Sequence, residues 1–366
     1  MIRVLHIGLS HSLGGIETFL ANISSVFDPT EFEFDYVAYG PAPALQDTFE
    51  AAGSHIYILG NRRNPFRYAN ELYAFMSKGY DVVHVHKNSA VDVIPFICAA
   101  HKDNLKVVSH SHNTHSNARI FGRILNSFGR GAILDTADAL LACSRAAGEW
   151  LYGEHAVETG RVQVIPNGID LKRYRFDSAK RKHIREMLGV SNRLLIGCVG
   201  RFTVQKNQRF LGDVLEELLA FGVDAGMLFL GDGPLRQDVE RMFTEKGLGE
   251  RAIFLGSVDN VADYLQGVDA LVMPSLYEGL PIALIEAQAS GLPIISSEAI
   301  TNEVVASDRF KRLPVSFGSE ILWAESILSF AKSSKIRCEP LNERILKFSS
   351  KAAAEAVASV YRKVCS

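Results

Sequence analysis

Hydrophobic and polar positions alternate along this chain in two rhythms, short apolar runs and longer amphipathic stretches. The short runs in the first part are rich in Val, Ile, Leu and aromatic residues, and they predict strands at residues 4–9, 34–39, 56–59, 82–85, 106–109 and 139–142. Helix-like segments separate several of these runs. Such alternation is typical of a parallel sheet with helices on both faces.

The rhythm breaks at VIPNGIDLKRYRF, residues 164–176, where Pro166, Asn167 and Gly168 interrupt the chain before a charged run. A second series of strands is predicted beyond it, at residues 194–199, 226–230, 252–255, 269–273 and 292–296. The last residues, 341–366, have the Ala, Glu and Lys content of a helix. The expected fold class is therefore α/β, with two doubly wound Rossmann-like domains joined near residue 170. Ligands of such domains bind at the carboxyl ends of the parallel strands.

Composition agrees with two soluble domains. The 366 residues are too many for one ordinary core, and 47% of them are hydrophobic and 22% charged. A formal net charge of −2 gives no general reason to expect nucleic acid as a partner. The five cysteines form no CxxC pair, as is typical of reduced thiols. We find no signal peptide and no run near the ~20 apolar residues of a membrane span, so we expect a cytoplasmic protein whose membrane contact, if any, is peripheral.

Candidate chemistry follows several of the predicted strands. The strand LLIGCVG leads into RFTVQKN, which places Arg201 and Lys206 on the loop between a strand and a helix. A guanidinium and an ammonium at that position suit a diphosphate, although a solvated basic loop is an equally common reason for such residues.

Two further strands end in glycine. LFLGDGPL turns at Gly231 and Gly233, which either lets the backbone approach a ligand or simply connects strand to helix. AIFLGSV ends at Phe254, Leu255 and Gly256, whose backbone groups are suitably placed to contact a flat base.

The segment YEGLPIALIE carries two glutamates, Glu278 and Glu286, on either side of a predicted helix start. With Pro281 at or near the first helical position, the amides of Gly279 and Leu280, together with that of Ile282, are expected to form an anion site at the helix N-terminus. Ionised carboxylates accept hydrogen bonds from hydroxyls, so the glutamates suit a sugar and a ribose. The alternative for Glu286 is a solvated helix carboxylate.

The strand at residues 106–109 ends in HSHNTH, which includes His110 and His112. A metal site is one interpretation, but no cluster of further ligands is evident and the spacing fits no zinc motif, so no metal is expected here.

Two basic stretches with interleaved aromatic and aliphatic residues, NRRNPFRY and ARIFGRILNSFGR, predict either a surface for anionic lipid or a core-facing stripe with a solvated basic face. The arginines concerned are Arg62, Arg63, Arg67, Arg119, Arg123 and Arg130.

Four segments together resemble motifs of one enzyme family. EGLPIALIE has the E-x7-E pattern of the retaining nucleotide-sugar glycosyltransferases of family 4, which have the GT-B fold. GRFTVQKN resembles the phosphate-binding loop of that family, VIPNGID its interdomain linker and GGIETFL its N-terminal glycine loop. The resemblance spans nearly the whole chain and is strongest over residues 164–302. In overall character it is closest to exopolysaccharide and capsule enzymes.

The resemblance implies an acceptor-binding domain at residues 1–168, a donor-binding domain at 169–341, and a helix at 342–366 that packs back on the first. In the donor domain, Arg201 and Lys206 would bind the diphosphate, Glu286 the ribose and Glu278 the transferred sugar. The remaining donor contacts implied are Phe254, Leu255 and Gly256 for the nucleobase, and Gly279 and Leu280 for phosphate.

In the first domain, the resemblance implies that Gly14 and Gly15 let a loop approach the diphosphate. It also implies a histidine near the reacting sugar, for which His112 matches best and His110 is second.

The implied reaction is transfer of a sugar, with retained anomeric configuration, from a UDP-sugar to a glycan or lipid-linked acceptor. The chain contains no DxD sequence, the metal-binding carboxylate pair of the other major glycosyltransferase fold, so Arg201, Lys206 and the helix N-terminus are expected to neutralise the leaving group. The alternatives are a GT-B epimerase or phosphorylase and, further removed, a dinucleotide-dependent oxidoreductase, whose GxGxxG fingerprint the first strand lacks.

Overall fold

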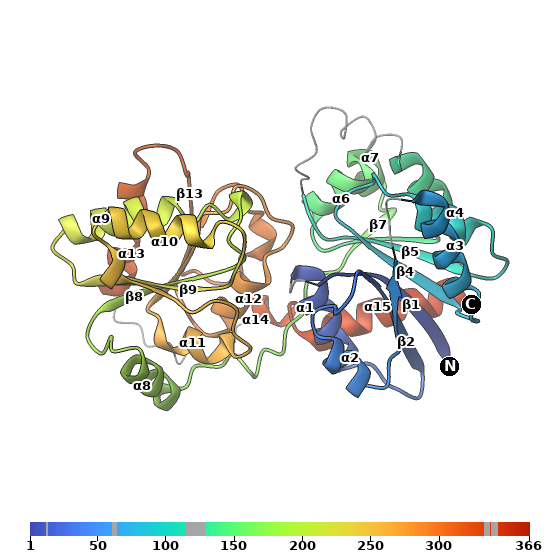
Figure 1. Ribbon diagram of the computed structural model, residues 1–366, viewed down its shortest axis with the longest axis horizontal. Helices are drawn as coiled ribbons and strands as arrows, with labels where there is room; N and C mark the ends of the chain where they lie inside the picture. Colours follow the sequence, from blue (N-terminus) through green and yellow to red (C-terminus); the bar gives the residue numbers. More distant parts are fainter. Residues whose placement is uncertain (12–13, 61–63, 115–128, 333–336, 338–342) are drawn as a thin grey trace. The chain divides into compact units, whose positions relative to one another are not determined.

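A computed structural model describes residues 1–11, 14–60, 64–114, 129–332, 337 and 343–366. The chain divides into two compact units, one formed by Met1–Ile169 with Lys347–Ser366 and the other by Asp170–Leu346. Each unit contains a parallel sheet with helices on both faces (Figure 1). The predicted fold class, α/β with two doubly wound Rossmann-like halves, is confirmed.

The first unit has a seven-stranded sheet in the order β3-β2-β1-β4-β5-β6-β7. Its strands are β1 (Ile2–Leu9), β2 (Phe32–Tyr39), β3 (Ile56–Leu59), β4 (Val82–Lys87), β5 (Lys106–Ser111), β6 (Ala139–Ala142) and β7 (Val162–Val164). Its described helices are α1 (Gly15–Ser24), α2 (Gln46–Ala51), α3 (Pro65–Met76), α4 (Ile94–Ala100), α6 (Arg145–Tyr152), α7 (Glu154–Glu158) and α15 (Ser350–Cys365).

The second unit has a six-stranded sheet in the order β10-β9-β8-β11-β12-β13. Its strands are β8 (Leu194–Val199), β9 (Ala225–Leu230), β10 (Ala252–Phe254), β11 (Ala270–Met273), β12 (Ile294–Ser297) and β13 (Phe310–Leu313). Its described helices are α8 (Ser178–Met187), α9 (Phe210–Ala220), α10 (Arg236–Glu245), α11 (Val261–Gly267), α12 (Ile282–Ala289), α13 (Glu320–Lys332) and α14 (Glu343–Leu346), with the 3-10 turns η1 (Val204–Lys206), η2 (Gly249–Arg251) and η3 (Asn302–Val304).

Every predicted strand is present, and the structure adds β7 and β13. Both additional strands are short edge strands with mostly half-buried or exposed side chains. A strand of this kind lacks the continuous apolar run that marks a buried parallel strand, so the hydrophobic pattern does not reveal it.

The helix expected at residues 342–366 is interrupted in the structure. α14 ends at Leu346 in the second unit, and α15 begins at Ser350 in the first. Between them, Ser349 pairs with Ile169 as an isolated parallel bridge, and its hydroxyl accepts a hydrogen bond from the amide of Ala352 (3.1 Å). This N-cap fixes the start of α15, so residues 347–349 are not helical.

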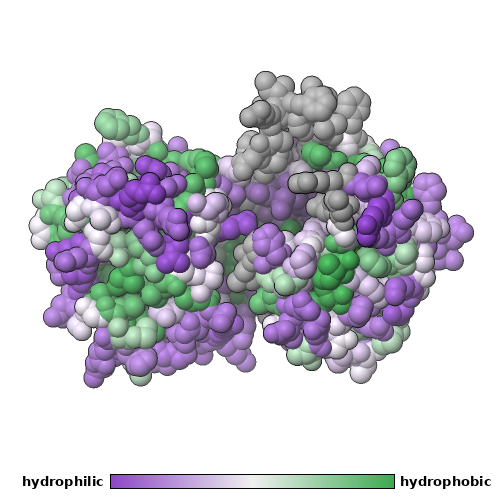
Figure 2. Space-filling model, viewed as in Figure 1, coloured by the Kyte–Doolittle hydropathy of each residue, from purple (hydrophilic) through white to green (hydrophobic). Residues whose placement is uncertain are grey.

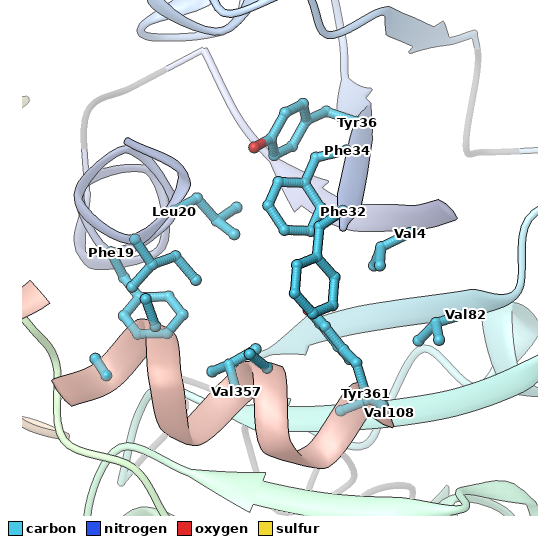
Figure 3. Packing of buried hydrophobic residues seen from close by; sticks show 14 of the residues in the cluster. Val4, Phe19, Leu20, Phe32, Phe34, Tyr36, Val82, Val108, Val357 and Tyr361 are labelled. Carbon is cyan, nitrogen blue, oxygen red and sulfur yellow. The ribbon is translucent and has the colours of Figure 1, made fainter. Parts of the chain in front are cut away.

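α15 forms part of the core of the first unit. Figure 3 shows Val357 and Tyr361 of α15 facing Phe32 and Phe34 of β2, with Phe19 of α1 beside them. The rings of Phe32 and Tyr361 lie 6.0 Å apart, and the hydroxyl of Tyr361 lies 2.5 Å from Nδ1 of His84 on β4. The last helix of the chain therefore completes the hydrophobic core of the first sheet.

Among the described residues, no helix has both the length and the apolar character to cross a membrane. On the face shown in Figure 2, hydrophilic and hydrophobic residues are interspersed.

The arginines of the predicted lipid surface are only partly within the described residues. Arg62, Arg63, Arg119 and Arg123 lie outside them. Arg67 pairs with Glu71 one helical turn away, at 2.8 Å, and Arg130 donates to the carbonyls of Trp150 (3.1 Å) and Leu151 (3.2 Å) near the end of α6. Both described arginines therefore have partners within their own unit.

Candidate donor site

The candidate site lies where the strand order of the second sheet reverses. The first strand of this unit, β8, has β9 on one side and β11 on the other, so the loops that leave β8 and β11 diverge at its carboxyl end. Ligands of doubly wound sheets bind at such a switch point.

The loop after β8 folds back over the end of its own strand. The buried side chain of Gln208 donates to the carbonyl of Arg201 (3.1 Å), and Asn207 has a left-handed conformation with φ 50°. A Cβ at Gly200 would lie 3.3 Å from Cε of Lys206, so the lysine stem crosses directly over this glycine. Arg201 is exposed at the strand end and Lys206 is partly buried.

Backbone and side-chain hydrogen bonds join this loop to the loop after β11. The amide of Leu276 donates to the carbonyl of Gln205 (2.8 Å), and the Gln205 side chain donates to the carbonyl of Tyr277 (2.9 Å). These bonds bring Lys206 to Glu278, with Nζ and Oε1 2.6 Å apart. Because only 20% and 10% of the two side chains are exposed, the ion pair is shielded from bulk water.

The helix that follows this loop begins one residue later than expected. α12 starts at Ile282, and Pro281 is its N-cap, with φ −70° and no side-chain capping bond. Gly279 and Leu280 are buried immediately before it. No side chain of Pro281 caps this helix, and the anion site expected at its N-terminus stays a prediction.

Glu286 lies in the interior of α12 and is not a solvated carboxylate. Its side chain is buried, and Oε1 accepts a hydrogen bond from the hydroxyl of Tyr174 at 2.6 Å. Burial raises the pKa of Glu286, and the hydrogen bond from Tyr174 partly opposes that shift. Burial likewise raises the pKa of Tyr174, which therefore remains a donor.

Sequence reasoning did not identify Tyr174. It lies in the charged run after the linker, 112 positions before its partner, and no local pattern connects the two. The available signal was an aromatic residue with a hydroxyl just after the Pro-Asn-Gly interruption.

The turns after β8, β9 and β10 contact one another through their backbones. The amide of Gly231 donates to the carbonyl of Gly256 (2.7 Å), and a Cβ at Gly231 would lie 2.3 Å from the carbonyl oxygen of Gly200. Gly231 also has φ +134°, which L-residues rarely adopt. The glycine turn is thus required for the close approach of neighbouring strand ends.

The segment predicted to contact the nucleobase, residues 254–256, lies partly in the hydrophobic core and partly at the end of β10. The ring of Phe254 stacks on Phe229 with centroids 4.7 Å apart and planes at 10°, so it belongs to the hydrophobic core. Leu255 and Gly256 follow at the end of β10, where the amide of Leu255 donates to the carbonyl of Phe229 (3.1 Å) and the carbonyl of Gly256 accepts from Gly231, so their role toward a base stays a prediction.

In the first unit, the predicted glycine loop ends at the start of α1. Gly14 is the N-cap and Gly15 the first helical residue, with no atom near the place of an added Cβ at Gly15. The buried carboxylate of Glu17 accepts hydrogen bonds from the amide (2.9 Å) and hydroxyl (2.8 Å) of Ser10, which ties the helix to the end of β1.

The two candidate histidines have different environments. His110 is fully buried within β5, whereas His112 is partly exposed just beyond the strand. The expectation that no further metal ligand lies nearby is wrong, because His86 on the adjacent strand β4 has Nδ1 2.9 Å from Nε2 of His112. The sequence does not show this cluster since its members come from different strands.

Comparison with known proteins assigns the family. Residues 13–173 match the model for Glycosyltransferase Family 4, and residues 193–332 match that for Glycosyl transferases group 1. The putative glycosyltransferase EpsF of Bacillus subtilis is 33% identical over 94% of this chain and 91% of its own length. The capsular polysaccharide biosynthesis glycosyltransferase CapH of Staphylococcus aureus is 28% identical over 92% of each chain.

Another relative is the UDP-Gal:alpha-D-GlcNAc-diphosphoundecaprenol alpha-1,3-galactosyltransferase of Escherichia coli, which is 25% identical over 84% of this chain and 82% of its own. Among solved structures, Anabaena HepE in complex with UDP-glucose has a TM-score of 0.84 at 18% identity, covering 99% of this chain and 100% of that chain.

The fold is that of the two-domain GT-B enzymes. The chain belongs to the family 4 (group 1) glycosyltransferases. The relatives described are all glycosyltransferases and give no support to the epimerase or phosphorylase alternative.

Proposed function

We propose that this chain is a retaining glycosyltransferase that transfers a sugar from a UDP-sugar to a glycan or lipid-linked acceptor during synthesis of a cell-surface polysaccharide. The observation that carries the proposal is the arrangement of Lys206, Glu278 and Glu286 around the N-terminal end of α12, at the switch point of the second sheet. The name of the E. coli galactosyltransferase supports a UDP-sugar donor and a lipid-linked acceptor, and that of CapH supports a role in polysaccharide synthesis.

The donor would bind with its diphosphate between Arg201, Lys206 and the first amides of α12. In this pose Lys206 exchanges its bond to Glu278 for phosphate oxygens, and Glu278 becomes available to the hydroxyls of the transferred sugar. Glu286, oriented by Tyr174, accepts from the ribose hydroxyls. The backbone of Leu255 and Gly256 faces the base.

In the transfer step, the bond between the anomeric carbon and the phosphate oxygen breaks, and its electron pair leaves with the diphosphate. The acceptor hydroxyl forms the new bond on the same face of the sugar, and its proton passes to the departing phosphate. Arg201, Lys206 and the dipole of α12 stabilise the negative charge that develops on the diphosphate. The proposed step assigns leaving-group stabilisation to these groups and invokes no metal.

The acceptor-binding role of the first unit rests on the family resemblance. His112 is partly exposed at the end of β5 and is the histidine assigned to the reacting sugar, with His110 buried behind it as the second candidate. The role of Gly14 and Gly15 toward the diphosphate likewise rests on the family resemblance. Peripheral membrane contact through the six arginines named above remains a prediction.

The test is a screen of UDP-, GDP- and ADP-sugars with short glycan and polyprenyl-diphosphate-linked acceptors, in which transfer is followed by mass spectrometry. We expect a UDP-sugar to be used, with activity lost in Glu278→Ala, Glu286→Ala and Lys206→Ala. The anomeric configuration of the product, determined by NMR, tests retention. A β-linked product from an α-linked donor, or wild-type rates in all three variants, would overturn the proposal.

A further inference from the structure

One face of the first sheet carries a line of histidines beneath α1 and α15. Four of them, His6, His84, His86 and His110, are buried on the adjacent strands β1, β4 and β5, and His112 is half-buried just beyond β5. In the sheet register His6 lies opposite His84, and His86 opposite His110. Phe19 of α1 packs over this face, and its ring centroid lies 5.1 Å from that of His110 and 5.3 Å from that of His112.

His86 is at the centre of this line and has a partner on each ring nitrogen. Its Nε2 lies 3.0 Å from Nδ1 of His6, and its Nδ1 lies 2.9 Å from Nε2 of His112. A neutral imidazole has one N–H and one lone pair, so His86 donates on one side and accepts on the other.

Several other nitrogens of the line are buried and have no hydrogen-bond partner. They are Nε2 of His6, Nε2 of His84, both nitrogens of His110 and Nδ1 of His112. Each buried polar atom left unsatisfied costs about 1–3 kcal/mol, so a ligand that uses these nitrogens would be stabilising. His110 is the most informative member because it is completely buried and neither of its nitrogens is satisfied.

Two groups of three histidines have nitrogens close enough to share an ion. In each group, one nitrogen per residue lies within 4.8 Å of the others, and the groups are His6, His84 and His86, and His86, His110 and His112. The first group is completely enclosed, with exposed fractions of 0–3%. The second includes His112, which is half-buried just beyond β5.

We propose that His86, His110 and His112 bind one divalent transition-metal ion of the zinc type at the carboxyl end of β4 and β5. Imidazole nitrogen is a preferred ligand of Zn²⁺, Co²⁺ and Ni²⁺, and Mg²⁺ and Ca²⁺ are excluded because they require oxygen ligands. A fourth position would remain open on the side of His112, as it does in three-ligand sites that keep a water.

Binding an ion requires the rings to turn. Two nitrogens that bind one ion at 2.0–2.1 Å with tetrahedral angles lie roughly 3.4 Å apart. Nδ1 of His86 and Nε2 of His112 lie 2.9 Å apart in a hydrogen bond, which the ion would replace, and one nitrogen of each of the three residues lies within 4.8 Å of the others. Burial lowers the pKa of His86 and of His110 well below the ordinary value, so their lone pairs are available at neutral pH. If His86 ligates through Nδ1, its Nε2–H donates to Nδ1 of His6, which orients the ligand as an outer-shell partner does.

The inference rests on these distances and does not depend on the proposed transfer reaction. The experiment uses the full chain without a histidine tag, stripped with a chelator and titrated with Zn²⁺ and Co²⁺ by calorimetry and absorption spectroscopy. We expect one equivalent per chain with a dissociation constant below about 1 μM, a rise in thermal stability, and the intense visible absorption of tetrahedral Co²⁺. Mg²⁺ should produce none of these effects.

Variants locate the site. His86→Asn, His110→Asn and His112→Asn should each weaken Zn²⁺ binding by at least ~100-fold, since losing a ligand costs no less than losing an outer-shell partner. His84→Asn, which alters only the enclosed group, and His101→Gln, an exposed histidine on the surface after α4, should bind as the wild type does. If the variants of buried residues do not fold, His112→Asn at the partly exposed position and the wild-type Co²⁺ spectrum still decide the question.

Three outcomes would overturn the inference. One is that the stripped wild type retains no ion at concentrations well above the expected dissociation constant. Another is stoichiometric binding that His110→Asn and His112→Asn leave unchanged, and the third is binding abolished by His84→Asn but not by His112→Asn.

Discussion

The ammonium nitrogen of Lys206 lies 2.6 Å from Oε1 of Glu278, so the residues assigned to the diphosphate and to the transferred sugar bind each other. The pair neutralises both charges where the loops after β8 and β11 meet. A donor that inserts its diphosphate beside Lys206 would release Glu278 for the sugar at the same time. Binding of the two parts of the donor is therefore expected to be coupled.

Replacing Lys206 should reduce catalysis more than it reduces stability. Because Lys206→Met removes a cation aimed at the leaving diphosphate, we expect the transfer rate to fall by ~10²–10³-fold, the usual effect of deleting one group that stabilises developing charge. Lys182→Met, which removes an exposed lysine of α8, is the matched control. Initial rates at saturating donor provide the measurement, and a rate within twofold of wild type would exclude Lys206 from leaving-group stabilisation.

The same ion pair should be detectable in the free energy of unfolding. Lys206→Met leaves a partly buried carboxylate without its cation, and Glu278→Gln leaves the cation without its carboxylate, so each single change should destabilise the second unit by about 1–3 kcal/mol. The double variant should lose less unfolding free energy than the two single variants lose together, with a coupling energy of about 1 kcal/mol or above.

A suitable reporter for this unit is Trp323, which is completely buried, in a background where Trp150 of the first unit is replaced by Phe. Since the chain contains two tryptophans, urea unfolding followed by fluorescence then reports on the second unit alone. Additive losses would show that the two charges do not interact energetically.

Tyr174 should support nucleotide binding without contacting the nucleotide. Its hydroxyl orients and stabilises the ionised form of Glu286, and a hydrogen bond to a charged group contributes about 1.5–3 kcal/mol. We expect Tyr174→Phe to weaken UDP binding by ~10-fold or more in calorimetry, whereas Tyr264→Phe on α11 should not. Unchanged affinity in Tyr174→Phe would mean that Glu286 does not depend on this bond.

The hydrogen bond between Tyr174 and Glu286 predicts how stability and UDP binding depend on pH. Burial raises the pKa of Glu286 above its ordinary value of 4.5, so this carboxylate takes up a proton at a higher pH in the folded chain than in the unfolded chain. The contribution of Glu286 to the free energy of unfolding is complete below pH 4.5, and it is lost as the pH rises through the pKa of Glu286 in the folded chain. Ribose binding needs the ionised carboxylate, so it appears over the same pH interval.

Removing the hydrogen bond from Tyr174 should raise the pKa of Glu286 further, so the acid limit of UDP binding should move to higher pH in Tyr174→Phe. Dissociation constants for UDP between about pH 4 and 8 test this, with Glu286→Gln as the reference, because the titration of UDP itself is common to all three proteins. Parallel profiles in the wild type and Glu286→Gln would show that Glu286 does not titrate in the binding range.

The sequence predicts the parts of this molecule that depend on local pattern. Buried parallel strands appear as continuous apolar runs, so β1 and β8 are recognisable, and the residues that follow them, such as Arg201, can be placed at strand ends. Placing these residues needs only the periodicity of the chain and the rule that ligands bind at strand ends. That Lys206 and Glu278 share one site is implied by the family resemblance, and the strand order that brings them together is seen in the structure.

The remaining features depend on contacts between distant positions. Tyr174 reaches Glu286 across 112 positions, and His86 reaches His112 across 26, because the fold places their elements side by side. The exposed edge strands β7 and β13 have no apolar signature of their own. Such contacts are set by strand order and packing, which a single sequence does not display.

The glycine turn after β9 provides a final prediction, on how the site is assembled. An alanine at Gly231 would place its Cβ 2.3 Å from the carbonyl oxygen of Gly200, in a backbone conformation with φ +134°. Gly222→Ala is the matched control, because Gly222 also has a positive φ, +74°, but no atom lies within 4 Å of an added Cβ. In the control, the free energy of unfolding should fall by about 1–2 kcal/mol from backbone strain alone. In Gly231→Ala it should fall further, because the ends of β8 and β9 must also separate. We further expect UDP affinity to fall in Gly231→Ala only, since the loop that carries Arg201 would be displaced. Equal losses of stability with unchanged UDP affinity would show that the close approach of the two turns does not maintain the site.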